Sequence, residues 1–152
     1  MTGTKIDGKI IAQTVKDRVK KSTDELKKDG INPCLATVLV GNNPASATYV
    51  KNKHKACEEV GIITKDHKLD ENTTQQQLNS IIDELNQDSS VHGILVQLPL
   101  PKHINKQHVI ETISPHKDVD GLHPMNVGNL SSGYQGSIPC TPLGCYYLLK
   151  KI

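Results

Sequence analysis

The chain has 152 residues, 36% of them hydrophobic and 22% charged, which is typical of one globular domain or of one domain and the start of another. Its net charge is only +2 and it contains no Phe or Trp, so the basic surface with interleaved aromatics that nucleic-acid binding needs is not indicated. No stretch approaches the roughly 20 apolar residues of a membrane helix. The N-terminus shows neither a signal core nor an Arg-rich presequence, so we expect a cytoplasmic protein without a membrane partner.

The four cysteines do not predict a disulfide framework or a zinc site. They are Cys34, Cys57, Cys140 and Cys145, and no two of them form a C-x-x-C pair. Cys34 lies in an apolar run, where a free thiol behaves as a small hydrophobic side chain.

The first part of the chain alternates helices and strands. Apolar residues at three- and four-residue spacing predict a helix over residues 10–29. The nearly continuous apolar run 34–40 is typical of a strand buried on both faces. Gly41-Asn42-Asn43-Pro44 ends this strand, and we expect a helix over 45–60 and a weaker strand over 62–69.

The pattern continues for one more helix and strand and then becomes irregular. Thr73-Thr74-Gln75-Gln76 resembles a capping box that opens a helix. Residues 93–98 predict a third strand, stopped by two prolines, and residues 103–113 one short helix. We expect a loop over 121–138, and then a helix that Thr141 caps, with Pro142 at its first position.

This order of elements predicts an α/β fold with a mainly parallel sheet between helical layers, a three-layer sandwich. Ligands of such sheets bind beyond the carboxyl ends of the strands. The loop after Val40 and the neighbourhood of Gln97 are therefore the expected places for a site.

Lys53 is the first candidate for chemistry. At about 100° per residue it falls on the apolar side of its helix with Cys57, whereas Lys51 and Lys55 fall on the far, solvated side. Loss of solvent disfavours the charged form of an amine and makes it usable as an acid or base near neutrality. Tyr49 lies one turn earlier on the same face and could orient the amine or stack on a flat substrate. The alternative is a structural lysine that reaches solvent from a buried stem.

Two further segments carry polar candidates. Gln97 lies near the end of an otherwise apolar strand, so its amide should find a partner, either a neighbouring loop or Lys53 and a substrate. Asp118 and Asp120 alternate along an extended segment, between His116 and His123. A metal site is the weaker alternative there, because the spacing matches no usual metal loop, and a carboxylate that grips paired N–H donors of a substrate is favoured.

A glycine-rich nucleotide site is not indicated. Residues 41–46 contain no Gly-Lys-Ser/Thr, Pro44 lacks an amide donor, and no G-x-G-x-x-G occurs in the 152 residues.

Four ordered motifs together resemble the bifunctional methylenetetrahydrofolate dehydrogenase/methenyltetrahydrofolate cyclohydrolase family. The motifs are V-L-V-G-N-N-P-A-S at 38–46 running into Y-V-x-x-K-x-K-A-C at 49–57, G-I-L-V-Q-L-P-L-P at 93–101, P-x-K-D-V-D-G at 115–121 and P-C-T-P-x-G at 139–144. The resemblance covers essentially the whole chain. One departure is Asn42, where the family often has Asp.

The resemblance implies roles for individual residues. Lys53 would be the general acid/base for oxidation of 5,10-methylenetetrahydrofolate and for hydrolysis of the methenyl form to 10-formyltetrahydrofolate. Gln97 would position Lys53, Tyr49 would stack on the substrate, and Asp120 would bind the amino-pyrimidinone edge of the pterin. The remaining site residues would line the pocket or, in the case of Thr141, lie near the cofactor: Val96, Leu98, Pro99 and Thr141.

The resemblance also implies an organisation. Residues 1–120 would be the folate-binding catalytic domain, of the kind found at the N-terminus of amino-acid dehydrogenases. Residues 121–138 would connect it to a linker helix beginning at 139–152, and a Rossmann domain for NADP, or NAD in some members, would follow outside this chain. Family members are expected to be cytoplasmic homodimers that serve one-carbon metabolism and purine biosynthesis. These 152 residues alone should not perform hydride transfer, and we expect at most weak folate binding and residual cyclohydrolase activity from them.

Two other interpretations remain open at this stage. Tyr49-x-x-x-Lys53 also has the spacing of the short-chain dehydrogenases, but that family needs a glycine-rich turn after its first strand. The chain could instead be a non-catalytic folding or interaction fragment.

Overall fold

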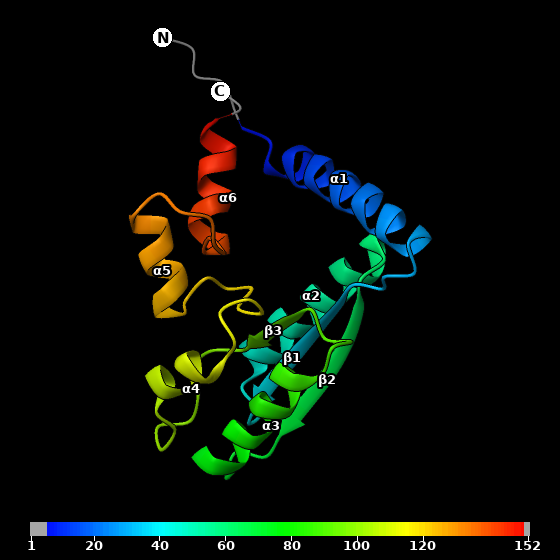
Figure 1. Ribbon diagram of the computed structural model, residues 1–152. Coiled ribbons are helices and arrows are strands. Elements are labelled where there is room, and N and C mark those ends of the chain that lie inside the picture. Colours follow the sequence, from blue (N-terminus) through cyan, green and yellow to red (C-terminus); the bar gives the residue numbers. More distant parts are fainter. Residues whose placement is uncertain (1–5, 151–152) are drawn as a thin grey trace.

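The computed structural model describes residues 6–150 and shows three parallel strands with helices on both faces, in the order β2-β1-β3 (Figure 1). The elements, in chain order, are α1 Gly8–Lys28, β1 Cys34–Val40, α2 Pro44–Val60, β2 Ile63–Leu69, α3 Gln75–Gln87, β3 Gly93–Val96, α4 Lys106–Thr112, α5 Pro124–Ser131 and α6 Cys140–Leu149. The expected α/β class with a parallel sheet between helical layers is confirmed.

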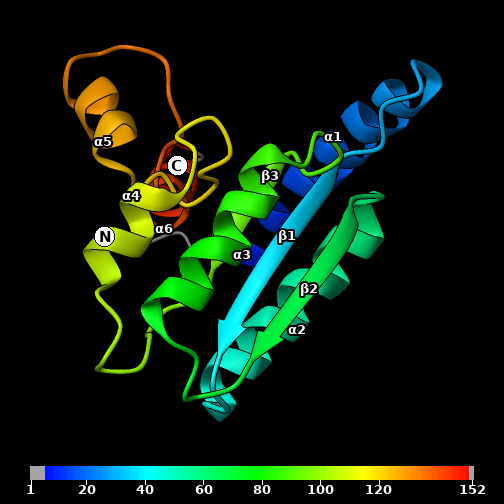
Figure 2. The same ribbon diagram turned by 60° about the horizontal axis from the view of Figure 1, so that its bottom comes forward.

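The core lies between the sheet and α3 with α4. Alternate residues of β1, from Cys34 to Val40, pack in one cluster with Leu78 and Ile82 of α3. The side chains of Leu78 and Ile82 are fully buried. The helix α2 covers the opposite face (Figure 2), and α1 lies against α2, where the Thr23 hydroxyl donates a hydrogen bond to the Val60 carbonyl. As expected of a strand buried on both faces, six of the seven residues of β1 are buried.

The caps of the first helices follow the sequence closely. Asn43 accepts hydrogen bonds from the amides of Ala45 and Ser46 at the start of α2, and Gly61 ends that helix with a φ of 79°. The capping box of α3 exists, but it is formed by Thr74 and Gln77, one residue later than expected from Thr73.

Three expectations for the later part of the chain were wrong. The third strand ends at Val96 rather than Leu98, because Pro99 and Pro101 cannot donate to a strand ladder. The expected loop over 121–138 contains the helix α5, for which Pro124 supplies a preset first turn and the His123 ring accepts from the Met125 amide. Thr141 does not cap the last helix: α6 begins at Cys140 after Pro139, without a side-chain cap.

Candidate functional site

A cavity of about 800 Å³ is bounded by α2, by β1 and β3 with their neighbouring loops, and by the segment that starts α6. Five residues singled out from the sequence line it together: Tyr49, Lys53, Gln97, Asp120 and Thr141. Tyr49 and Thr141 stand far apart in the chain, so the fold and not local sequence assembles the site.

Lys53 and Gln97 form a direct contact inside this cavity. The Lys53 ammonium donates to Gln97 Oε1 at 3.2 Å, and Gln97 Nε2 donates to the Leu98 carbonyl at 2.7 Å. The second bond fixes which end of the amide faces the lysine, because only the oxygen can accept from an ammonium. On α2, Lys53 is half-buried whereas Lys51 and Lys55 are exposed, which is the separation expected from the helical periodicity.

Asp120 supplies the negative side of the cavity. Burial raises the pKa of its carboxyl above the usual value, the nearby Lys53 ammonium acts in the opposite direction, and Asp118 adds a smaller increase. A carboxylate with little solvent is short of hydrogen-bond donors, so it is suited to accept two parallel N–H groups from a flat ligand.

Tyr49 and Thr141 lie at the rim. Tyr49 is 63% exposed, so its ring is open to stacking against a ligand that enters the cavity. Two thiols that the sequence interpretation did not assign to the site, Cys57 and Cys140, also line it. Cys57 follows Lys53 by one helical turn, and this spacing was the signal that could have placed it there. Burial raises the pKa of the Cys57 thiol, and the pKa of the Cys140 thiol is raised by partial loss of solvent and by the nearby Asp120 carboxylate, so the thiolate form is disfavoured at both positions.

Three other expected lining residues lie elsewhere. Val96 and Leu98 line a separate, small apolar cavity. Asp120 lines both this small cavity and the 800 Å³ cavity. Pro99 lines a third cavity, of about 350 Å³, at the carboxyl ends of the strands. Contact of these residues with a substrate therefore stays a prediction.

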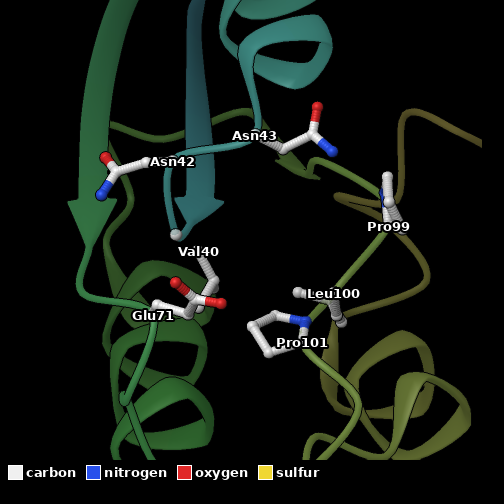
Figure 3. Close-up of a pocket in the computed structure, with 8 residues that line it drawn as sticks. Val40, Asn42, Asn43, Glu71, Pro99, Leu100 and Pro101 are labelled. Carbon is white, nitrogen blue, oxygen red and sulfur yellow. The ribbon is translucent and has the colours of Figure 1, made fainter.

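Figure 3 shows this third cavity, with Val40 at the end of β1, Glu71 from the segment between β2 and α3, and the segment from Pro99 to Pro101 around it. It is where the rule for parallel sheets pointed, but neither Lys53 nor Gln97 lines it. The 350 Å³ cavity contains one carboxyl group, that of Glu71, whereas the 800 Å³ cavity combines Asp120 with the hydrogen-bonded pair of Lys53 and Gln97, and we therefore take the 800 Å³ cavity as the candidate site.

Metal binding at Asp118 and Asp120 gains no support. Within residues 6–150, no group of three or more His, Cys, Asp or Glu side chains is arranged to hold a metal ion. The carboxylate of Asp118 is engaged instead by the His123 amide and by Asn126, both at 2.9 Å.

Comparison with known proteins gives one consistent result. Residues 6–120 match the family model "Tetrahydrofolate dehydrogenase/cyclohydrolase, catalytic domain". The bifunctional protein FolD of Nitrosopumilus maritimus is 68% identical over 144 residues, which is 95% of this chain and 50% of that protein. FolD of Campylobacter concisus is 56% identical over 146 residues, 96% of this chain and 52% of that protein.

Solved structures agree. The bifunctional FolD methylenetetrahydrofolate dehydrogenase/cyclohydrolase of Campylobacter jejuni superposes with a TM-score of 0.95 at 54% identity, covering 97% of this chain and 53% of that one. The Trypanosoma brucei enzyme, solved with NADP and an inhibitor, gives a TM-score of 0.93 at 34% identity, covering 99% and 52%. The chain thus spans about half the length of the curated relatives it matches.

Proposed function

Since the chain belongs to the tetrahydrofolate dehydrogenase/cyclohydrolase family, we propose that its 800 Å³ cavity binds a one-carbon derivative of tetrahydrofolate and that Lys53 is the general acid/base there. The observation that carries the proposal is the 3.2 Å contact between Lys53 Nζ and Gln97 Oε1 in a cavity that also contains Asp120.

The geometry supports a division of roles. Gln97 holds the Lys53 amine at one side of the cavity, where it can give a proton to a leaving nitrogen or take one from an attacking water. The ionised carboxylate of Asp120 accepts hydrogen bonds from the amino and ring N–H groups of the pterin. Tyr49 stacks on the ligand at the open side of the cavity. The substrate's reacting carbon is then held next to the amine, which is the positioning that proton transfer requires.

Hydrolysis of the methenyl group is the step that these residues can serve by themselves, because it needs water and a proton carrier only. Within the 152 residues no glycine-rich phosphate turn occurs, so they do not supply the usual glycine-rich site for a nicotinamide dinucleotide, and the family resemblance gives Thr141 as a neighbour of such a cofactor. In the whole protein we propose that an NADP-dependent oxidation precedes hydrolysis, as the names of its relatives suggest.

For the whole protein we also propose a cytoplasmic homodimer that supplies 10-formyltetrahydrofolate for purine biosynthesis, on the basis of the family resemblance. We further propose residues 1–120 as the folate-binding domain, 121–138 as the connection and 139–152 as the start of a linker. Nothing in residues 6–150 forms a helix that is both long and apolar enough to cross a membrane.

The test is hydrolysis of 5,10-methenyltetrahydrofolate, followed by its loss of absorbance. Lys53→Met should lower the rate by at least about a hundredfold, the usual contribution of a positioned acid/base. The matched control is Lys55→Met on the exposed face of the same helix, which should retain the parent rate. A parent chain no faster than buffer, or a Lys53→Met variant as fast as the parent, would contradict the proposal.

A further inference from the structure

Asp120 lies in a short loop, and a hydrogen bond between the buried Asp118 carboxylate and the His123 amide joins the two ends of this loop. Asp118 is 3% exposed, and its Oδ2 accepts a hydrogen bond from the His123 amide at 2.9 Å, on the far side of Asp120 in the chain. Gly121 turns the loop with a φ of 65°, a conformation that other residues rarely adopt. The direction of the Asp120 side chain thus depends on where the carboxylate of Asp118 is held.

Asn126 holds it. Its Nδ2 donates to Asp118 Oδ2 and to the Pro115 carbonyl, both at 2.9 Å. Asn126 is 4% exposed and is the single buried residue of α5, whereas the apolar Met125 and Leu130 of the same helix are exposed. A polar side chain and not an apolar one therefore attaches this helix to the protein, so the attachment is directional.

The same carboxamide also contacts the segment that precedes α6. Asn126 Oδ1 accepts from the Ser137 amide at 3.4 Å, and the backbone from 137 to 139 passes so close to Gly121 that an added Cβ would meet the Ser137 oxygen at 2.8 Å. This segment leads directly into Cys140 and Thr141, which line the cavity. One buried amide thus connects the Asp120 loop with the segment that leads into Cys140 and Thr141.

We propose that Asp118 and Asn126 are positioning residues that hold the Asp120 carboxylate in the orientation that recognises the paired N–H donors of a pterin. Neither side chain lines the 800 Å³ cavity, so both act through Asp120. The inference rests on the proposed function, because it assigns the ligand-recognition geometry of the same site.

The main test is a double-mutant cycle on the dissociation constant for 5,10-methenyltetrahydrofolate. Asn126→Ala should weaken binding on the order of tenfold, the effect of disturbing one charged hydrogen bond. Asn126→Ala in an Asp120→Asn background should cause little further loss, because the group being positioned is already changed. Additive losses would mean that Asn126 acts on the site in another way and would overturn the proposal.

Two further variants make the cycle specific. Asn129→Ala, in the same helix, deletes a carboxamide that bonds the Gln135 carbonyl but does not touch Asp118, and it should bind as the parent does. Gly136→Ala keeps Asn126 but places a Cβ at 3.0 Å from its Oδ1, so it should cause a smaller loss in the same direction even if Asn126→Ala fails to fold. For a folate analogue without the 2-amino group, which keeps only the ring N–H donor, the loss of affinity caused by Asn126→Ala should be smaller than for the folate itself.

A measurement without ligand separates this inference from the proposed function. Carboxyl ¹³C NMR titration should find the raised pKa of Asp120 in the parent and in Asn129→Ala, and a lower one in Asn126→Ala, where the loop opens to solvent. If the parent binds no folate, the proposed function is contradicted while this titration still decides the positioning. An unchanged Asp120 pKa in both Asn126→Ala and Gly136→Ala would overturn the inference.

Discussion

The sheet region and the region after residue 117 are held together by different forces. In residues 34–113 the interior is mainly apolar, and three side chains of α3, one of α4 and most of β1 are buried in one cluster. In α5 the single buried side chain is Asn126, and α6 buries none. Hydrophobic burial tolerates small shifts, whereas hydrogen bonds fix direction, and the site lies where the two regions meet.

This difference predicts where a substitution acts. Lys53 and Gln97 come from the sheet region, and Asp120 and Thr141 from the later one. Damage to the first region should therefore lower the stability of the whole protein, and damage to the second should change ligand binding while the sheet remains folded.

The largest expected effect is in the sheet core. Ile82 of α3 is completely buried against β1, so Ile82→Ala should lower the free energy of unfolding by about 2–5 kcal/mol, measured by urea denaturation. The matched control is Ile10→Ala, because Ile10 is 67% exposed on α1 and its truncation should change stability by less than about 0.5 kcal/mol. Equal effects of the two truncations would show that the core is not where the structure puts it.

An intermediate effect is expected at the junction of the two regions. An added Cβ at Gly93 of β3 would come within 2.5 Å of Val119 Cγ1, so Gly93→Ala should push the Asp120 loop away from the sheet. We expect a loss of about 1–3 kcal/mol in stability, as in other overpacked sites, together with weaker folate binding.

Gly128→Ala on α5 is the control for that substitution. Its added Cβ would meet nothing within 4 Å, and alanine favours a helix, so stability should stay equal or rise by up to about 1 kcal/mol. Gly93→Ala with parent-like stability and affinity would contradict the close contact between β3 and the loop.

The two regions also differ in how far the sequence predicts them. The strands and the helices around them follow from apolar periodicity, caps and glycines, and the side of α2 on which Lys53 lies follows from the helical repeat. The helix α5 was missed because its anchor is polar: the apolar residues of Pro124–Ser131 face solvent, so no apolar periodicity marks it. The meeting of Lys53 with Gln97 and Asp120 could not be obtained from periodicity, because it depends on how distant loops fold over one face of the sheet.

The smallest expected effect has opposite signs for stability and for binding. Because burial raises the pKa of Asp120, the folded protein binds this proton more tightly than the unfolded chain does. The stability gained from tighter proton binding at Asp120 is fully present below the ordinary aspartate pKa, and it is lost as the pH rises through the raised pKa of Asp120. Asp120→Asn cannot ionise, so relative to the parent it should gain stability at about pH 7 but not at about pH 3.

Thermal unfolding at the two pH values measures this difference. The control is Asp83→Asn at an exposed position of α3, which should leave the unfolding temperature unchanged at both pH values.

The same Asp120→Asn substitution should weaken folate binding about tenfold or more, because an amide oxygen replaces a charged acceptor. In the parent, binding should weaken as the pH falls through the raised pKa of Asp120, at a higher pH than for an ordinary aspartate. A variant that loses stability at neutral pH would show that the Asp120 carboxylate supports the fold, and the assignment of this group to ligand recognition would then have lost its physical basis.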